Sequence, residues 1–162
     1  MAVTVRRIRP DDGPLLKRVR LAALLDTPSA FAKTHAEEST YTDGEWTRRA
    51  TEWSVGDEGL TAFAELDGDV VGLVGGHRPT PGLTELVSMW VDPVARGNGI
   101  GQALIDAVVE WADGEPVELW VTHGNDPAIA LYVRAGFAVT DDVQPLPSDP
   151  CQNEVRMRRG CR

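Results

Sequence analysis

A glycine-rich stretch beside an arginine is the part of this sequence whose residue types and spacing are best suited to chemistry. From Val91 to Gln102 the chain reads Val-Asp-Pro-Val-Ala-Arg-Gly-Asn-Gly-Ile-Gly-Gln. Glycine allows positive φ angles and close approach of a ligand to the backbone, and the first amides of a helix have no intrahelical acceptor. An apolar strand that passes through such a turn into an amphipathic helix predicts a phosphate site, to which Arg96 adds a positive charge.

Two common phosphate-binding loops do not fit these residues. No Lys-Ser or Lys-Thr pair follows the glycines, as it would in a P-loop. The third glycine, Gly101, comes too early for the Gly-x-Gly-x-x-Gly fingerprint of dinucleotide-binding folds. The spacing therefore favours a different pyrophosphate ligand.

The segment Arg96–Gly101 resembles the Q/R-x-x-G-x-G/A signature of the GNAT superfamily of N-acetyltransferases. On its N-terminal side, Glu85–Pro93 is similar to the fourth strand of that family and its exit. On its C-terminal side, Asn125–Phe137 is similar to the family's second motif. The resemblance is close over about residues 83–140 and looser, through element order, over the rest. It implies that the ligand is acetyl-CoA, used as a cosubstrate.

The resemblance also assigns residues to acetyl-CoA. Backbone amides that follow Arg96 would hold the pyrophosphate, and the strand before them would pair with pantetheine and polarise the thioester carbonyl. Asn125 would hydrogen-bond the pantetheine arm, although it also suits a helix cap, and the Trp90 side chain also suits the core. The residues assigned to the cosubstrate are Met89, Trp90, Val91, Arg96, Gly97, Asn98, Gly99, Ile100, Gly101, Gln102 and Asn125.

Two further residues match catalytic positions of the family. Tyr132 lies seven residues after Asn125, where many members place a tyrosine near the sulfur of the coenzyme. A phenol with a pKa of about 10 stays protonated at neutral pH and can protonate the leaving thiolate. Glu85 lies six residues before Val91, the offset of the catalytic glutamate in the histone-acetylating branch, and is the candidate general base. The alternatives are a half-buried core tyrosine and a solvated strand glutamate.

Other titratable residues are weaker candidates. His35, His77 and His123 have a side-chain type suited to proton transfer, but none has a partner pattern. Glu37, Glu38 and Asp43 lie where the family binds acceptors and would attract a cation, or else are simply exposed. No spacing typical of metal ligands occurs, so no metal is expected.

Hydrophobic periodicity predicts the elements that must position these residues. Asp12 and Asp43 are expected to cap the first two helices, residues 31–41 to be irregular, Asp67-Gly68-Asp69 to form a hairpin turn and residues 145–150 to form a proline-rich excursion. The expected strands are Val3–Ile8, Leu60–Leu66, Val70–Gly76, Leu83–Val91, Val117–Val121, Phe137–Thr140 and Glu154–Arg158. The expected helices extend to about Leu25, begin at Asp43, and span Gly101–Trp111 and Pro127–Arg134.

Two of these helices show a clear apolar face. The first face comprises Leu15, Leu16, Val19, Ala22 and Ala23, and the second comprises Leu104, Ala107, Val108 and Trp111. Together with the resemblance, the element order implies an α/β (α+β) fold of GNAT type. We expect a mixed, mostly antiparallel sheet of six to seven strands, splayed between the fourth and fifth and flanked by about four helices.

Composition narrows the partners and the location. The chain of 162 residues suits a single domain, 1–162, and its net charge of −9 argues against nucleic acid or an anionic membrane as a partner. No apolar run has the length of a membrane span or of a secretory signal, and Cys151 and Cys161 suit free thiols. We therefore expect a cytoplasmic protein, with homodimerisation possible for the family.

The function predicted from the sequence is an N-acetyltransferase that moves an acetyl group from acetyl-CoA to a primary amine. The acceptor is expected to be a small cationic amine or a protein amine that attacks directly in a ternary complex. The alternative is a noncatalytic acyl-CoA-binding regulatory protein, which would keep the phosphate loop but lack turnover.

Overall fold

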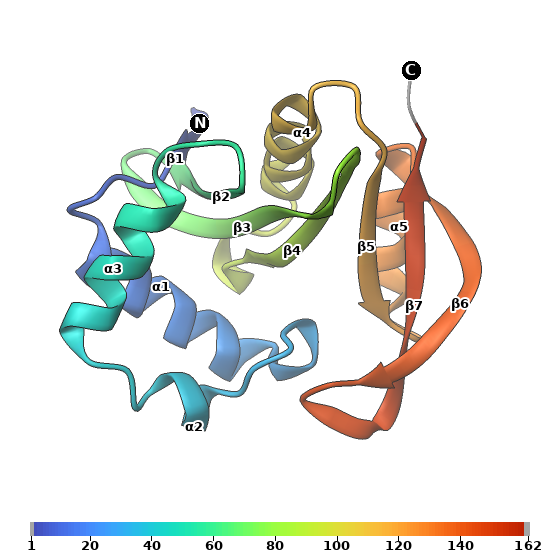
Figure 1. Cartoon of the computed structure of the whole chain (residues 1–162), viewed down its shortest axis with the longest axis horizontal. Helices are drawn as coiled ribbons and strands as arrows, with labels where there is room; N and C mark the ends of the chain where they lie inside the picture. The colour runs from blue at the N-terminus through green and yellow to red at the C-terminus, as the bar shows by residue number, and fades with distance from the viewer. Residues whose placement is uncertain (1, 161–162) are drawn as a thin grey trace.

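The computed structural model describes residues 2–160 as one seven-stranded sheet with helices on both faces (Figure 1). The strands are β1 (Val3–Arg7), β2 (Gly59–Leu66), β3 (Asp69–Thr80), β4 (Leu83–Val91), β5 (Val117–Thr122), β6 (Ala138–Leu146) and β7 (Asp149–Arg159). The α-helices are α1 (Gly13–Asp26), α2 (His35–Glu38), α3 (Asp43–Trp53), α4 (Ile100–Ala112) and α5 (Asp126–Arg134). Short 3-10 turns occupy Pro28–Ala30 and Pro93–Ala95.

The sheet is divided into two parts between β4 and β5. Its strand order is β1-β2-β3-β4-β5-β7-β6, and every neighbouring pair is antiparallel except β4 and β5. These two parallel strands pair only at Thr84 with Val117 and at Glu85 with Glu118. Figure 1 shows the strands meeting near one end and diverging toward the other. The predicted mixed, mostly antiparallel sheet with a splay after the fourth strand is confirmed.

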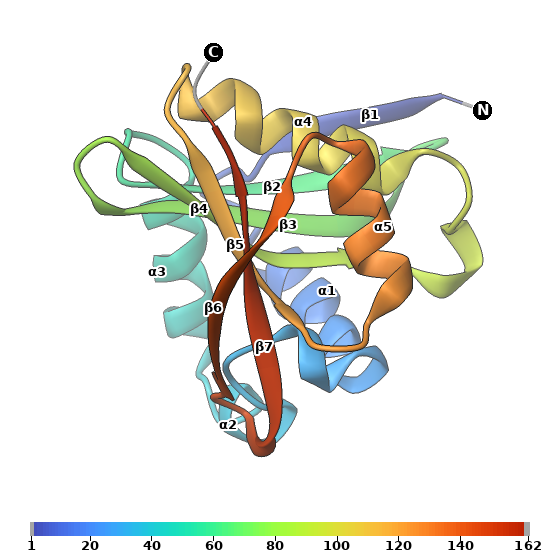
Figure 2. The ribbon, with the colours of Figure 1, turned by 90° about the vertical axis from the view of Figure 1, so that its right-hand side faces the viewer.

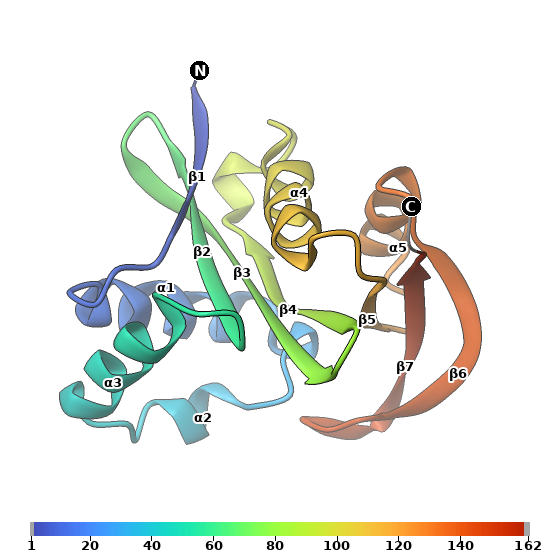
Figure 3. The same ribbon diagram turned by 45° about the horizontal axis from the view of Figure 1, so that its top comes forward.

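Two helical layers cover opposite faces of the sheet (Figures 2 and 3). One buried cluster joins α4 and α5 to the sheet through residues such as Leu104, Val108 and Tyr132. A second cluster lies beneath α1 and α3 and includes Trp46 and Trp90. Each strand that runs between them presents alternate residues to the two layers, so both cores are built on one sheet.

The helical faces differ in detail from the sequence prediction. In α4, Leu104 and Val108 are buried as expected, but Trp111 is only partly buried and Ile105 is fully buried. In α1, Ala22 is exposed and Leu24 is buried. A helix that packs in a groove buries a wider face than the i, i+3, i+4, i+7 pattern describes. The neighbouring elements determine which residues lie at the centre of that face.

Helix starts and one turn also require correction. The cap of α3 is Thr42 rather than Asp43, because the Thr42 hydroxyl accepts a hydrogen bond from the amide of Glu45 in a capping box. Asp12 is the N-cap residue of α1, as expected, although its side chain makes no capping hydrogen bond. The segment predicted as irregular contains the single-turn helix α2. Residues 145–150 mostly belong to the β6–β7 hairpin, in which Pro145 is tolerated because β6 is an edge strand.

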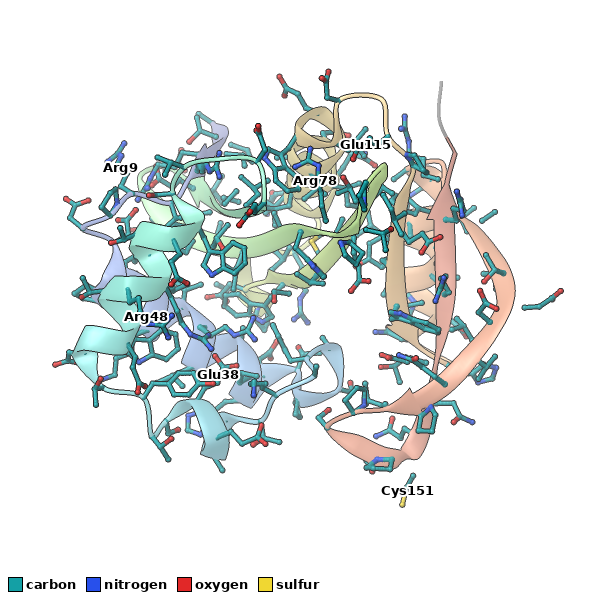
Figure 4. The ribbon with its side chains drawn as sticks, in the orientation of Figure 1. Arg9, Glu38, Arg48, Arg78, Glu115 and Cys151 are labelled. Carbon is teal, nitrogen blue, oxygen red and sulfur yellow. The ribbon has the colours of Figure 1, made fainter. Side chains whose placement is uncertain are left out.

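Several simple properties of the described chain complete the fold. Within residues 2–160, no helix combines the length and apolar character needed to cross a membrane. The same residues contain no group of three or more His, Cys, Asp or Glu side chains placed to hold a metal ion. Cys151 is a free, exposed thiol on the β6–β7 hairpin (Figure 4), and Cys161 lies outside the described residues.

Loss of packing in α4 should destabilise the protein measurably. Val108 is fully buried between α4 and the sheet, whereas Val94 is 89% exposed. Val108→Ala should lower the free energy of unfolding by about 2 kcal/mol, because two buried carbons are lost and a cavity remains. Val94→Ala should change it by less than about 0.5 kcal/mol. Urea denaturation followed by circular dichroism measures both values, and equal losses would contradict the assigned packing.

Candidate active site

A β-bulge in β4 lies where the two parts of the sheet separate. Leu73 faces Trp90 across the strand pair while Gly75 faces Val87, so β4 contains one additional residue between these pairs. Leu86 belongs to the core under α4 and Trp90 to the core under α1, although a spacing of four would place both on the same face of a regular strand. The bulge therefore reverses which face of the sheet the side chains at the end of β4 point to.

Ser88 is the strained residue of this bulge. Its φ of 56° is unusual for a residue with a side chain. Its hydroxyl accepts a hydrogen bond of 2.5 Å from the guanidinium of Arg20, which extends from α1. Strained backbone held by neighbouring groups often occurs at functional sites.

The glycine-rich loop connects the bulged strand to α4. Gly97 and Gly99 adopt φ angles of 85° and 77°, and the Asn98 side chain donates a 2.8 Å hydrogen bond to the carbonyl of Ala95 that stabilises the turn. A Cβ atom at Gly101 would approach Leu131 of α5 to 2.8 Å. The free amides at the start of α4 and the absence of side chains at Gly97 and Gly99 make a surface suited to a phosphate.

The sequence suggested that Arg96 adds a free positive charge to the loop. In the structure the charge of Arg96 is paired. Its guanidinium lies 2.7 Å from the Asp26 carboxylate, at the end of α1, and donates a 3.0 Å hydrogen bond to the carbonyl of Val91. Asp26 also accepts a 2.9 Å hydrogen bond from the Trp90 indole. This bond lowers the pKa of Asp26, and the positive charge of Arg96 acts in the same direction. The ion pair ties the loop to α1 and reduces the charge available to a ligand.

A cleft of about 1010 Å³ passes between the diverging strands. It extends from the glycine-rich loop and α5 to the α1–α2 segment and the β6–β7 hairpin. The structure brings together in its lining Glu85, Met89, Trp90, Val91, Arg96, Gly97, Gly99, Ile100, Gly101, Gln102, Asn125 and Tyr132. Among the residues assigned to the cosubstrate, Asn98 is the one outside this lining, because its side-chain amide is directed into the turn.

Tyr132 enters the cleft from α5. Its ring is buried and packs edge-to-face against Phe137, with ring centroids 5.8 Å apart. Burial raises the pKa of its phenol above the usual value, so the proton remains on oxygen throughout the neutral range. Asn125 caps the same helix by accepting a hydrogen bond from the amide of Ala128, which fixes the position of α5 beside the cleft.

Glu85 and Glu154 form a pair of carboxylates in the cleft. Glu85 lies 3.2 Å from His77 Nε2, and this hydrogen bond raises the pKa of His77 against the effect of burial. Burial raises the pKa of Glu154 on β7; the hydrogen bond from Gln144 opposes the shift, and the charge of Glu85 adds to it. Glu154 was not expected from the sequence to line the site. It is buried like its neighbour Val155, and the Gln144 side chain that contacts it comes from another strand.

The acidic residues proposed to attract a cation are engaged elsewhere. Glu38 is fully buried and accepts hydrogen bonds of 2.9–3.1 Å from Arg20. Glu37 completes the capping box of α2, and Asp43 pairs with Lys17 at 3.3 Å. Each carboxylate thus already has a local partner, which sequence alone did not reveal.

The three histidines differ in their distance from the cleft and in their partners. His35 contacts Ser39 on the exposed side of α2, and His123 is exposed after β5. His77, in contrast, lies beside the candidate base Glu85. Only this histidine of the three therefore has a charged partner that lines the cleft.

Comparison with known proteins identifies the family. The model of the acetyltransferase (GNAT) family matches residues 22–137. The chain belongs to the GNAT family. Its fold agrees with that of a GNAT acetyltransferase from Streptococcus pneumoniae, with a TM-score of 0.81 and 20% identity over 98% of this chain and 99% of the other. It also agrees with PaiA N-acetyltransferase from Thermoplasma acidophilum, solved with coenzyme A (TM-score 0.75, 16% identity, 99% of both chains).

Sequence relatives of this GNAT chain include larger proteins. A mycothiol acetyltransferase of Mycobacterium avium is 33% identical over 154 residues, which cover 79% of this chain and 49% of the relative. That of Sanguibacter keddieii is 35% identical over 159 residues, or 91% of this chain and 48% of the relative. The GNAT chain thus spans about half the length of these curated relatives.

The Asp26 carboxylate should make the stability of this GNAT protein depend on pH. Because the folded pKa of Asp26 is depressed, its contribution is present above the unfolded pKa of about 3.8 and is lost as pH falls through the folded value. Asp26→Asn should cost about 1–2 kcal/mol at pH 7 and less at pH 3. Urea denaturation at both pH values tests this, with Asp141→Asn on exposed β6 as the control. An equal loss at both pH values would contradict the ion pair.

Proposed function

We propose that this GNAT protein transfers an acetyl group from acetyl-CoA to a primary amine. The observation that carries the proposal is the continuous cleft through the sheet, with the glycine-rich loop at one end and the Glu85 carboxylate farther along its lining. Family membership supports the same chemistry, and a relative of known fold is a phosphinothricin acetyltransferase from Sinorhizobium meliloti solved with AcCoA.

The residues of the cleft fit the cosubstrate. Gly97 and Gly99 have no side chain above the amides at the start of α4, which would hold the pyrophosphate. Pairing with β5 stops at Glu85, so the remainder of β4 has backbone groups available to a pantetheine chain. Asn125, at the start of α5, would bond the same arm. Bound there, acetyl-CoA supplies an acetyl group activated as a thioester.

Two residues would manage the protons of the transfer. Glu85, acting through water, would accept a proton from the incoming ammonium and leave the nitrogen lone pair free for attack. As the C–N bond forms and the C–S bond breaks, Tyr132 would donate its proton to the departing sulfur. The second proton lost by nitrogen leaves through solvent and restores the phenol. An amide of Met89, Trp90 or Val91 would stabilise the charge that develops on the carbonyl oxygen.

Coenzyme A release across a panel of amines and peptides tests the function and Tyr132 together. Wild-type protein should release coenzyme A only when an acceptor is present. Tyr132→Phe should lower kcat by about 10²-fold or more, while acetyl-CoA affinity changes less than about threefold, because the phenol is needed only as sulfur departs. Chromatography follows release without labelling Cys151.

Each other outcome has a defined meaning. If acetyl-CoA binds but no amine stimulates release, the protein is better described as a noncatalytic acyl-CoA-binding regulator. If acetyl-CoA does not bind, the assignment of the glycine-rich loop is wrong. Unchanged kcat in Tyr132→Phe would remove that residue from the mechanism.

The two cleft carboxylates can be distinguished by their effects on pH dependence. If Glu85 is the base, Glu85→Gln should abolish the acidic limb of the kcat/KM profile, whereas Glu154→Gln should retain it. The same Glu85→Gln substitution should lower the pKa of His77, because it removes the partner that favours the imidazolium. NMR titration of His77 measures that shift independently of turnover. An unaltered pH–rate profile would exclude Glu85 as the base.

A further inference from the structure

A second, smaller hollow opens beside the bulge of β4. It measures about 300 Å³ and lies between α1, α3 and the sheet, with Trp46 and Trp53 among its walls. It shares Arg20, Val87 and Ser88 with the large cleft. We call it the tryptophan pocket. Its volume is at the lower end of those that hold small ligands.

A cluster of two arginines and one carboxylate adjoins the tryptophan pocket. Arg20 and Arg49 both line the pocket. Both contact the buried carboxylate of Glu38, which Figure 4 labels. Arg20 engages both Glu38 oxygens and also bonds Ser88. Two guanidinium groups and one carboxylate leave one positive charge without a partner within this cluster.

Arg49 is the guanidinium with unused capacity. Its contact with Glu38 is long, at 3.5 Å, and its other hydrogen bond, of 3.2 Å, goes to the neutral hydroxyl of Tyr41. A guanidinium offers five donors and binds carboxylates in a bidentate manner. The buried indole N–H of Trp46 also has no acceptor among residues 2–160. Unpaired buried donors are uncommon in folded proteins.

The large cleft beyond Ser88 carries charges of both signs, because Arg20, Lys33, Arg96 and Arg134 line it together with two carboxylates. Glu85 and Glu154 belong to the large cleft, where the reacting amine would lie under the proposed function. Lys33 lies at the rim of the same cleft, and His77 lies between Glu85 and the tryptophan pocket and lines the latter. A ligand that spans both hollows therefore meets Glu85 and Glu154 in the large cleft and Arg49 in the tryptophan pocket.

We propose that the acceptor is a free amino acid with an apolar side chain. Its ammonium group lies on the side of Glu85 and Glu154, its carboxylate pairs with Arg49, and its side chain contacts the walls of the tryptophan pocket. This inference rests on the proposed acetyl transfer and specifies its substrate class. A peptide N-terminus fits less well, because its first carboxyl group is a neutral amide and its chain must leave a pocket of about 300 Å³.

Matched acceptors test the inference on the wild-type protein. Leucine, methionine and phenylalanine are compared with the amines that lack only the carboxylate, namely isopentylamine, 3-(methylthio)propylamine and phenethylamine. A charge-assisted bond to Arg49 should make kcat/KM about ten- to a hundredfold higher for each amino acid than for its amine. Calorimetric titration of the same amino acids into protein saturated with coenzyme A measures their binding without turnover.

Variants of neighbouring arginines then locate the effect. Arg49→Gln should reduce the preference for the amino acid toward one, while Arg49→Lys keeps part of it and acetyl-CoA affinity stays the same. Arg48→Gln is the matched control, because Arg48, which Figure 4 labels, is exposed on α3. Its guanidinium pairs with Glu52. Circular dichroism confirms that each variant is folded.

The outcomes separate the two proposals. Acetyl-CoA binding with equal or better turnover of the decarboxylated amines, or of peptides, overturns the amino-acid assignment and leaves acetyl transfer intact. Failure of the amino acids to bind in calorimetry overturns it as well. Loss of acetyl-CoA binding itself would instead overturn the proposed function. If folded Arg49→Gln still prefers the amino acid to its amine, a group other than Arg49 binds the carboxylate, and the assignment of Arg49 is wrong.

Discussion

The parting of β4 from β5 is the constraint on which the rest of the structure depends. The two strands pair only at Thr84 with Val117 and at Glu85 with Glu118. Beyond these residues, β4 and β5 no longer pair with each other, although each keeps its partner on the other side. Unpaired backbone groups inside a protein are costly unless something else satisfies them. The separation is nevertheless maintained, because one buried cluster under α4 and α5 extends across both halves of the sheet, and a second cluster under α1 and α3 packs on the opposite face of the β1–β4 half. The opening is therefore built into the topology and does not require a loop to move.

Polar contacts keep the two halves at a fixed separation. Asp26 joins the end of α1 to Trp90 of β4 and to Arg96 of the glycine-rich loop. On the other side of the opening, the Thr122 hydroxyl of β5 donates a 2.9 Å hydrogen bond to the carbonyl of Ser29, just after α1. The segment that follows α1 thus contacts both walls of the cleft. Local order in this segment and the width of the opening are coupled.

The sequence contained more information about the glycine-rich loop than about the buried polar contacts. Gly97, Gly99 and Gly101 lie within five residues of the chain and reflect local backbone geometry, so the turn they form could be predicted from their spacing. The boundaries of β4 followed from its hydrophobic pattern in the same way. The enclosed polar groups differ, because Glu38, Arg20 and Ser88 are brought together from three separate elements. No periodicity encodes such a contact, and acidic residues in loops resemble exposed ones until their partners are known.

The conformation of Ser88 has a consequence for how this chain can evolve. A serine with positive φ retains backbone strain of about 1–3 kcal/mol that a glycine would relieve. Glycine would also remove the hydroxyl that accepts from Arg20, and with it the link between the bulge and the buried Glu38. Ser88→Gly would therefore raise the thermal stability of the protein and at the same time weaken the attachment of the β4 bulge to Arg20. Selection for robustness and selection for precise geometry oppose each other at this residue.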